Sequence, residues 1–199
     1  MIRLENLHKT FNEGTINERK ALININLKLE EGDFVSVIGG NGAGKSTLLN
    51  LIAGVYEADS GHIFFDDIDV TETKEHLRAR FLGRVFQDPM LGTAANMQIE
   101  ENLALALRRG KRRTLAWGIR HFEKEMYKKE LAMLDLGSEN RMTTKVGLLS
   151  GGQRQALTLL MATIKKPRLL LLDEHTAALD PKTALKVLQL TDEIVQKEN

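Results

Sequence analysis

The chain has 199 residues, which is typical of one domain with or without a subdomain and too short for two independent domains. It carries 28 Lys and Arg residues against 27 Asp and Glu, so its net charge of +1 gives no global reason to expect nucleic acid or an anionic membrane as its main partner. The absence of Cys excludes disulfides, thiolate metal sites and a Cys nucleophile.

The first half of the chain alternates short strand patterns with one helix pattern. In chain order, we expect strands at 2–7 (edge-like), 22–29 and 34–38, a helix at 46–53, and strands at 62–65 and 82–86. The strand at 34–38 is predicted to be buried, because it is rich in β-branched residues and runs directly into glycines.

The second half is more helical. Apolar residues at helical spacing among many charges predict a helical insertion over about 98–136, followed by a helix at 153–164, a strand at 168–172 and a final helix at 181–196. Alternating strands and helices indicate a mainly parallel α/β core. No apolar run approaches the roughly 18 residues of a spanning helix, so we expect the chain to reach a membrane only through another protein.

A glycine-rich loop lies between the strand at 34–38 and the helix at 46–53. Residues 39–46, GGNGAGKS, match the phosphate-binding pattern G-x-x-x-x-G-K-[ST]. Glycines let successive N–H groups converge on phosphate oxygens, and the helix that follows points its positive end at the same anion. Lys45 is expected to reach the β- and γ-phosphates, Ser46 to bind Mg²⁺, and Thr47 to contact an inner phosphate.

An apolar strand at 169–172 ends in two carboxylates, Asp173 and Glu174. Next to a phosphate loop, Asp173 is expected to hold Mg²⁺, usually through water, and Glu174 to act as general base on the attacking water. His175 follows, and a turn residue is the favoured interpretation over a metal ligand.

A second helix start lies at Ser150, in the sequence LSGGQ at 149–153. Ser150 is a candidate N-cap, and Gly151 and Gly152 expose backbone N–H groups suited to an anion.

Together these motifs resemble the ATP-binding subunits of ABC transporters. Residues 39–46 look like their Walker A motif, 169–174 their Walker B and 149–153 their signature. Gln87 resembles the Q-loop glutamine that senses Mg²⁺ and the transport partner, Asp180 the D-loop aspartate, and Phe11 the aromatic residue that stacks on adenine.

The resemblance implies a P-loop NTPase core with a mainly parallel sheet, an N-terminal antiparallel β subdomain and a helical subdomain at about 88–150. It further implies a head-to-tail homodimer in which ATP lies between the Walker A motif of one copy and the signature of the other. Nucleotide contacts are then expected from Phe11, Gly39, Asn41, Gly42, Ala43, Gly44, Lys45, Ser46, Thr47, Ser150, Gly151, Gly152, Gln153 and Asp180. Metal contacts are expected from Ser46, Gln87 and Asp173, and catalytic roles from Glu174, Gln87 and Lys45.

The implied function is ATP hydrolysis that powers uptake of a small solute, such as an amino acid, as in a branch of bacterial importers. The expected partners are an integral membrane permease and a substrate-binding protein, with no nucleic acid, and the expected location is peripheral, at the cytoplasmic side of the membrane. A non-transport ABC ATPase acting on ribosomes or DNA is the alternative, disfavoured by the short segment between Gln87 and Ser150 and by the neutral charge.

Two departures from the family pattern bear on activity. His175 stands where the family usually has Pro, and no His occupies the place of the switch histidine beyond the D-loop. The resemblance also predicts further core strands after Asn199, so the C-terminal end is expected to be truncated. We expect nucleotide binding to survive this better than hydrolysis.

A basic cluster, defined by Arg108, Arg109, Lys111, Arg112 and Arg113, belongs to none of these motifs. A solvated helix end or a contact with lipid headgroups is favoured over a nucleic-acid site, because aromatic residues are not interleaved.

Overall fold

A computed structural model describes the chain except for residues 112–117, 135–136, 174–183, 186–187, 190–191 and 193–199. The chain folds as two compact units, Met1–Ala79 and Arg80–Asn199, each with its own sheet.

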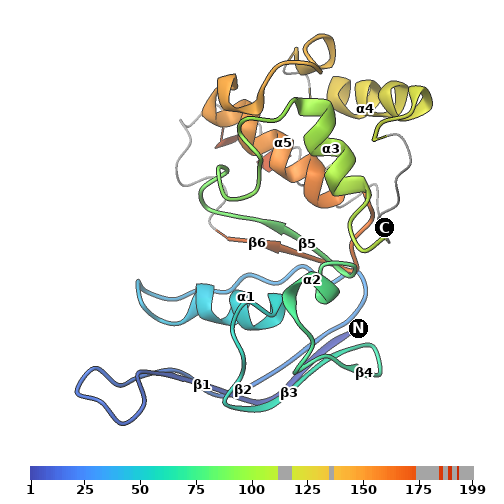
Figure 1. The fold of residues 1–199 in the computed structure, drawn as a ribbon. Coiled ribbons are helices and arrows are strands. Elements are labelled where there is room, and N and C mark those ends of the chain that lie inside the picture. The colour runs from blue at the N-terminus through green and yellow to red at the C-terminus, as the bar shows by residue number, and fades with distance from the viewer. Residues whose placement is uncertain (112–117, 135–136, 174–183, 186–187, 190–191, 193–199) are drawn as a thin grey trace. The chain divides into compact units, whose positions relative to one another are not determined.

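The first unit is built on an antiparallel sheet with the strand order β2-β1-β3-β4 (Figure 1). The strands are β1 (Ile2–Phe11), β2 (Arg19–Leu29), β3 (Ser60–Phe65) and β4 (Ile68–Asp69). This confirms the antiparallel β subdomain. The prediction of an edge-like strand at the N-terminus was wrong, because β1 pairs with β2 on one side and with β3 on the other.

Helix α1 (Lys45–Ala53) packs the apolar side chains Leu48, Leu51 and Ile52 into the first unit. Gly44 before the helix and Gly54 after it are both in the left-handed conformation, and the helix ends at Gly54 as the sequence predicts. The short helix α2 (Glu75–Arg78) is the last element of this unit.

The segment 34–38 contradicts the prediction of a buried strand. It forms no strand, and Phe34 and Ile38 are 75% and 93% exposed. β-Branched residues favour an extended chain only where neighbouring strands and a core receive them, and no described strand pairs with this segment.

The second unit contains a parallel pair of strands, β5 (Leu82–Val85) and β6 (Leu169–Leu172), in register from Leu82 opposite Leu169 to Val85 opposite Leu172. Its helices are α3 (Ile99–Leu107), α4 (His121–Met133) and α5 (Gly151–Thr163), with 3₁₀ turns at Ser138–Asn140 and Val146–Leu148. The predicted strands and helices of this region are therefore confirmed to within a few residues. Of the predicted C-terminal helix, the described residues 184, 185, 188, 189 and 192 are helical.

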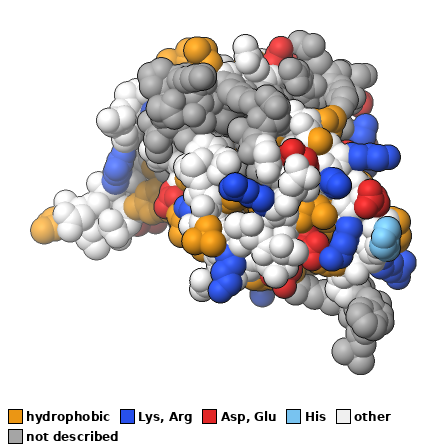
Figure 2. All heavy atoms as spheres, turned by 90° about the horizontal axis from the view of Figure 1, so that it is seen from above, with side chains coloured by type: hydrophobic (Ala, Val, Ile, Leu, Met, Phe, Trp, Pro, Cys, Tyr) orange, Lys and Arg blue, Asp and Glu red, His pale blue; other side chains and the backbone are white. Residues whose placement is uncertain are grey.

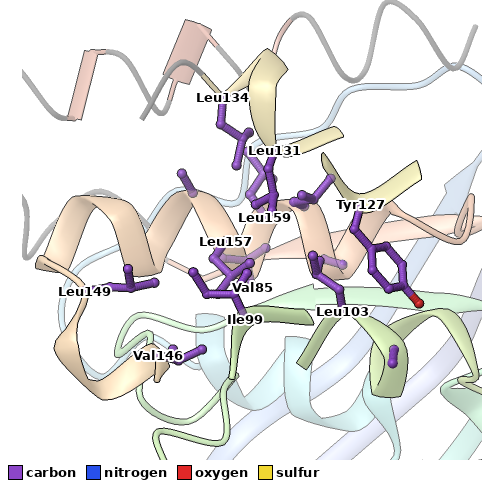
Figure 3. Close-up of a cluster of buried hydrophobic side chains, with 14 residues drawn as sticks. Val85, Ile99, Leu103, Tyr127, Leu131, Leu134, Val146, Leu149, Leu157 and Leu159 are labelled. Carbon is purple, nitrogen blue, oxygen red and sulfur yellow. The ribbon is translucent and has the colours of Figure 1, made fainter. Parts of the chain in front are cut away.

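The core of the second unit lies where α3, α4 and α5 meet strand β5 (Figure 3). Val85, Ile99, Leu103, Leu131 and Leu159 are fully buried there. Each such side chain contributes about 2 kcal/mol of hydrophobic free energy, so this cluster fixes α5 on the strand pair.

Candidate nucleotide-binding site

The phosphate loop at 39–44 is a turn whose backbone requires glycine. Gly42 and Gly44 have φ angles of 82° and 90°, in the left-handed region that favours glycine. A Cβ on Gly44 would lie 2.5 Å from the carbonyl oxygen of Ala21, so the loop passes directly against β2. The expected glycine-dependent curl is therefore present.

Lys45 and the start of α1 give this loop its positive charge. The Lys45 ammonium donates to the carbonyl oxygens of Gly39 (2.8 Å) and Gly40 (3.2 Å), which bridges the loop across its mouth. The first turn of α1 contains no acidic residue, so its N-terminal N–H groups keep their positive potential. Ser46 is exposed at the same helix end, and Thr47 is half-buried. The arrangement suits an anion with several oxygens.

Strand pairing places Phe11 near this loop. Phe11 lies opposite Arg19 in the β1–β2 register, and the Arg19 guanidinium donates to the carbonyl oxygen of Gly42. The Phe11 ring also meets the Tyr56 ring edge-on, with 5.4 Å between the ring centroids. No sequence motif predicts these contacts of Arg19 and Tyr56, because each contact joins segments that are distant in the chain and meet only in the folded structure.

Asp59 anchors the end of β1 that carries Phe11. Its carboxylate accepts from the Lys9 ammonium (2.6 Å) and from the backbone N–H of Thr10. Burial raises the pKa of Asp59, but these donors outweigh it and lower the pKa below its ordinary value. The carboxylate is therefore held in its charged form at neutral pH.

In the second unit, Ser150 caps α5 as predicted. The Ser150 hydroxyl accepts from the backbone N–H of Gln153 (3.3 Å), and the Gln153 side-chain oxygen accepts from the Ser150 N–H (3.1 Å). This reciprocal capping box leaves Ser150 and Gly151 exposed at the helix start. Gln153 therefore has a structural contact in addition to the ligand contact expected from the sequence.

Gln87 and Asp173 follow the ends of the parallel strands β5 and β6. Leu172 lies opposite Val85, and the Asp173 backbone N–H donates to the Val85 carbonyl (3.1 Å). Parallel pairing thus puts both residues at one sheet edge, the carboxyl end where open α/β sheets bind ligands. Glu174, His175 and Asp180 lie outside the described residues.

The predicted residues thus divide into three groups. Phe11 and residues 39–47 come together in the first unit, whereas Gln87 with Asp173 and residues 150–153 belong to the second. Oxygen donors such as the Ser46 hydroxyl and the Asp173 carboxylate are the kind that Mg²⁺ prefers. Among the described residues, no three His, Asp or Glu side chains gather as a metal cluster of their own.

Charges on the face in Figure 2 are mixed. Among the described residues drawn in Figure 2, Lys and Arg side chains lie among acidic and apolar ones. In the described part of the chain, no helix is long and apolar enough to cross a membrane.

Three comparisons connect this geometry to known proteins. A family model described as "ABC transporter" matches residues 22–177. The tyrosine transport ATP-binding protein of Clostridioides difficile (strain R20291) is 44% identical over 199 residues, which cover 100% of this chain and 79% of that protein. The phosphonates import ATP-binding protein PhnC of Alcaligenes faecalis is 33% identical over 201 residues, covering 99% of this chain and 70% of that protein.

Solved structures of ABC transporter cassettes are also similar to this chain. The dimeric structure of a bacterial ABC transporter cassette matches with a TM-score of 0.83 and 31% identity, covering 100% of this chain and 84% of that one. A post-hydrolysis state of the same cassette, bound to ADP and Pi, matches with the same TM-score, identity and coverage.

Proposed function

This chain belongs to the ABC transporter family as an ATP-binding cassette, and from that premise we propose that two copies bind and hydrolyse ATP head to tail to drive uptake of a small solute. The observation that carries the proposal is that one chain has two helix starts suited to a phosphate, at Lys45 in one unit and at Gly151 in the other. A composite site uses both, one from each copy.

Within that site, Phe11 stacks on the adenine and residues 39–47 surround the phosphates. Lys45 leaves the carbonyls of Gly39 and Gly40 to pair with the β- and γ-phosphates, which offer a charged acceptor in place of neutral ones. Ser150, Gly151 and Gly152 of the second copy contact the γ-phosphate, and Gln153 and Asp180 are further proposed nucleotide contacts.

Hydrolysis depends on the edge formed by the ends of β5 and β6. Glu174 accepts a proton from the water that attacks the γ-phosphate. Ser46, Gln87 and Asp173 would hold Mg²⁺, which neutralises charge on the β- and γ-phosphates when bound. The same Gln87 couples the nucleotide state to the transport partner.

The proposed partners are an integral permease, contacted by the helical subdomain at about 88–150, and a substrate-binding protein. The 199 residues then act as a single cassette, peripheral at the cytoplasmic side of the membrane. The 44% identity with a tyrosine transport ATP-binding protein over the whole chain supports an amino acid as solute, and tyrosine as the first candidate.

Size-exclusion chromatography of the Glu174→Gln variant tests the composite site. This change removes the proposed general base but keeps the shape of the side chain, so ATP should persist and hold two copies together. We expect a dimer with ATP and a monomer with ADP. Adding Lys45→Ala should restore the monomer, because losing the charged hydrogen bonds to phosphate weakens binding about 10- to 100-fold.

If the Glu174→Gln chain retains bound ATP and still elutes as a monomer, the two helix starts do not share a nucleotide and the head-to-tail arrangement is wrong.

A further inference from the structure

The two helices that begin at the phosphate-binding motifs share a feature at their opposite ends. Neither α1 nor α5 has a basic residue in its own last turn. In each case an arginine from another segment donates to the carbonyl groups at the helix C-terminus, Arg78 to α1 and Arg109 to α5.

Arg78 is the more deeply buried of the two, with only 2% of its surface exposed. Its guanidinium donates to the carbonyl oxygens of Leu51 (2.7 Å) and Ile52 (3.1 Å), in the last turn of α1. It also donates to Thr71 and Thr73, both at 2.7 Å, in the segment between β4 and α2. One side chain therefore joins the end of the helix to the rest of the unit.

Gly54 is fitted to this arginine. A Cβ at that position would lie 2.9 Å from Nε of Arg78, so the chain leaves α1 directly over the guanidinium. The contact at the C-terminus of α1 therefore depends on the arginine and also on a glycine that leaves space for it.

Arg109 makes the equivalent contacts on α5. Its guanidinium donates to the carbonyl oxygens of Ala162 (3.2 Å) and Lys165 (3.1 Å), at and just past the helix end. The Lys165 ammonium returns a hydrogen bond of 2.6 Å to the carbonyl of Arg109, which closes a reciprocal link. Ala162 also lies against β5, where a Cβ on Gly83 would come within 2.5 Å of its carbonyl oxygen.

For two members of the basic cluster, these contacts correct the expectation of a solvated helix end, whereas Arg112 and Arg113 lie outside the described residues. Arg108 pairs with the Glu123 carboxylate, and Arg109 faces the end of α5. Two members of the cluster are therefore committed to contacts inside their own unit.

The physical effect of each arginine reaches the opposite end of its helix. The last carbonyls of a helix have no partner within it and carry partial negative charge, which a guanidinium satisfies with several donors at once. A helix whose C-terminus is joined to its surroundings cannot tilt or slide freely. Its N-terminal N–H groups then stay where phosphate oxygens must meet them, and displacements near 1 Å are costly in such sites.

We propose that Arg78 and Arg109 are positioning residues for the two halves of the ATP site. Arg78 holds α1 for the nucleotide bound by residues 39–47 of the same copy, and Arg109 holds α5 for the phosphate contact that residues 150–152 make with the nucleotide of the other copy. The Arg109 half rests on the proposed head-to-tail function, whereas the Arg78 half requires only nucleotide binding.

The two roles predict different patterns in two assays on the full chain carrying Glu174→Gln, because only the ADP assay separates Arg78 from Arg109. The first assay is the affinity for a fluorescent ADP analogue, measured at low temperature on the monomer. The second is the ATP concentration needed for dimerisation in size-exclusion chromatography. We expect Arg78→Gln to weaken ADP affinity about tenfold or more, and Arg109→Gln to leave ADP affinity within about twofold but to raise the ATP requirement for dimerisation about tenfold.

Matched controls are exposed basic residues in the same units. Lys74→Gln lies four residues before Arg78, and Arg141→Gln lies in the second unit; both side chains are exposed. Neither change should alter either assay. The variants Arg78→Lys and Arg109→Lys keep the charge but not the planar set of donors, so we expect partial rescue.

A purely fold-stabilising role gives a different result. If Arg78→Gln and Arg109→Gln lower only the melting temperature and, while folded, bind ADP and dimerise like their parent, the proposal is wrong. Where Arg78→Gln fails to fold, Arg78→Lys is read in the same assays, and parental ADP affinity in that variant overturns the Arg78 half.

The Glu174→Gln parent tests the head-to-tail function separately from the role of Arg78. If Glu174→Gln binds ATP but does not dimerise, the head-to-tail function fails and the Arg109 role falls with it. The ADP assay still decides the role of Arg78.

Discussion

At Gly61 the neighbouring backbone of the first sheet leaves no room for a side chain. The φ angle of Gly61 is 91°, and a Cβ there would lie 2.4 Å from the carbonyl oxygen of Asn6 and 2.5 Å from that of Glu5. These oxygens belong to an irregular step of β1, where the register with β3 shifts between Glu5 and His8. Glycine at position 61 therefore lets β3 pair with a bulged strand.

We expect Gly61→Ala to lower the free energy of unfolding by about 3 kcal/mol, because strain at positive φ adds to a clash with backbone that cannot turn aside. Gly14→Ala is the matched control. Gly14 also has a positive φ, 73°, but nothing lies within 4 Å of its Cβ position, so only about 1 kcal/mol should be lost. Urea unfolding followed by far-ultraviolet circular dichroism measures both, and equal losses would contradict the steric argument.

Some functional residues could be placed from the sequence, whereas others could not. Lys45, Ser150 and Asp173 were placed correctly at a helix start or strand end, because each motif is a short contiguous stretch whose local chemistry defines its backbone. Arg19, Arg78 and Arg109 were not identified as contacts of motif segments. Their partners lie 23, 26–27 and 53–56 positions away in the chain, so only the tertiary fold brings them together.

Among the elements, α4 is joined to the end of α3 by a buried ion pair, in addition to the Lys124–Glu100 pair and the shared hydrophobic core. The Glu123 carboxylate, in the first turn of α4, accepts two hydrogen bonds from Arg108 at 3.0 and 2.9 Å and a third from the Arg120 N–H at 2.7 Å. The side chain of Glu123 is only 9% exposed. Burial raises the pKa of Glu123, but these donors outweigh it and lower the pKa below its ordinary value.

The sign of this pKa shift sets a pH dependence. A lowered pKa in the folded state means that the pair stabilises the protein fully above the unfolded-state pKa of 4.5, and that this stability is lost as pH falls through the lower folded-state pKa. We expect Glu123→Gln to cost about 2 kcal/mol at pH 7 and progressively less below about pH 4.5.

Glu125→Gln, on the same helix but exposed, is the control and should change stability by less than about 0.5 kcal/mol. Chemical unfolding at several pH values gives the comparison. A cost for Glu123→Gln that stays constant down to pH 3 would show that the charge of Glu123 does not contribute to the stability of this contact.

The sequence predicts most helices and strands correctly, but the segment 34–38 is an exception. Helices α1 and α5 have strong signals at their starts and apolar faces at helical spacing, and both were identified. The segment 34–38 has the composition of a buried strand, yet it forms none. Composition encodes the capacity to pair in a sheet, whereas the partner strand is a property of the whole fold.

For the whole molecule, the proposed role in amino-acid uptake can be tested in cells. Deleting the gene for this chain should reduce uptake of labelled tyrosine to background, and a plasmid copy should restore it. A copy with Lys45→Ala should not, because without that ammonium the loop loses its charged contact with the β- and γ-phosphates.

Uptake of a labelled phosphonate, measured in the same strains, provides the comparison, since a phosphonate import protein is also similar to this chain. Tyrosine uptake that is unchanged by the deletion would rule out tyrosine as the solute. A loss of phosphonate uptake alone would assign that solute class instead.

The capping box at the start of α5 has a consequence for how this position tolerates substitution. As a helix cap, Ser150 is interchangeable with Asp or Asn, which satisfy the same N–H group about equally well. As a γ-phosphate contact, it must offer a neutral hydroxyl whose hydrogen remains free to donate while its oxygen accepts from Gln153. An aspartate would preserve the helix and repel the nucleotide. At position 150, therefore, a screen for folding and a screen for transport would select different residues.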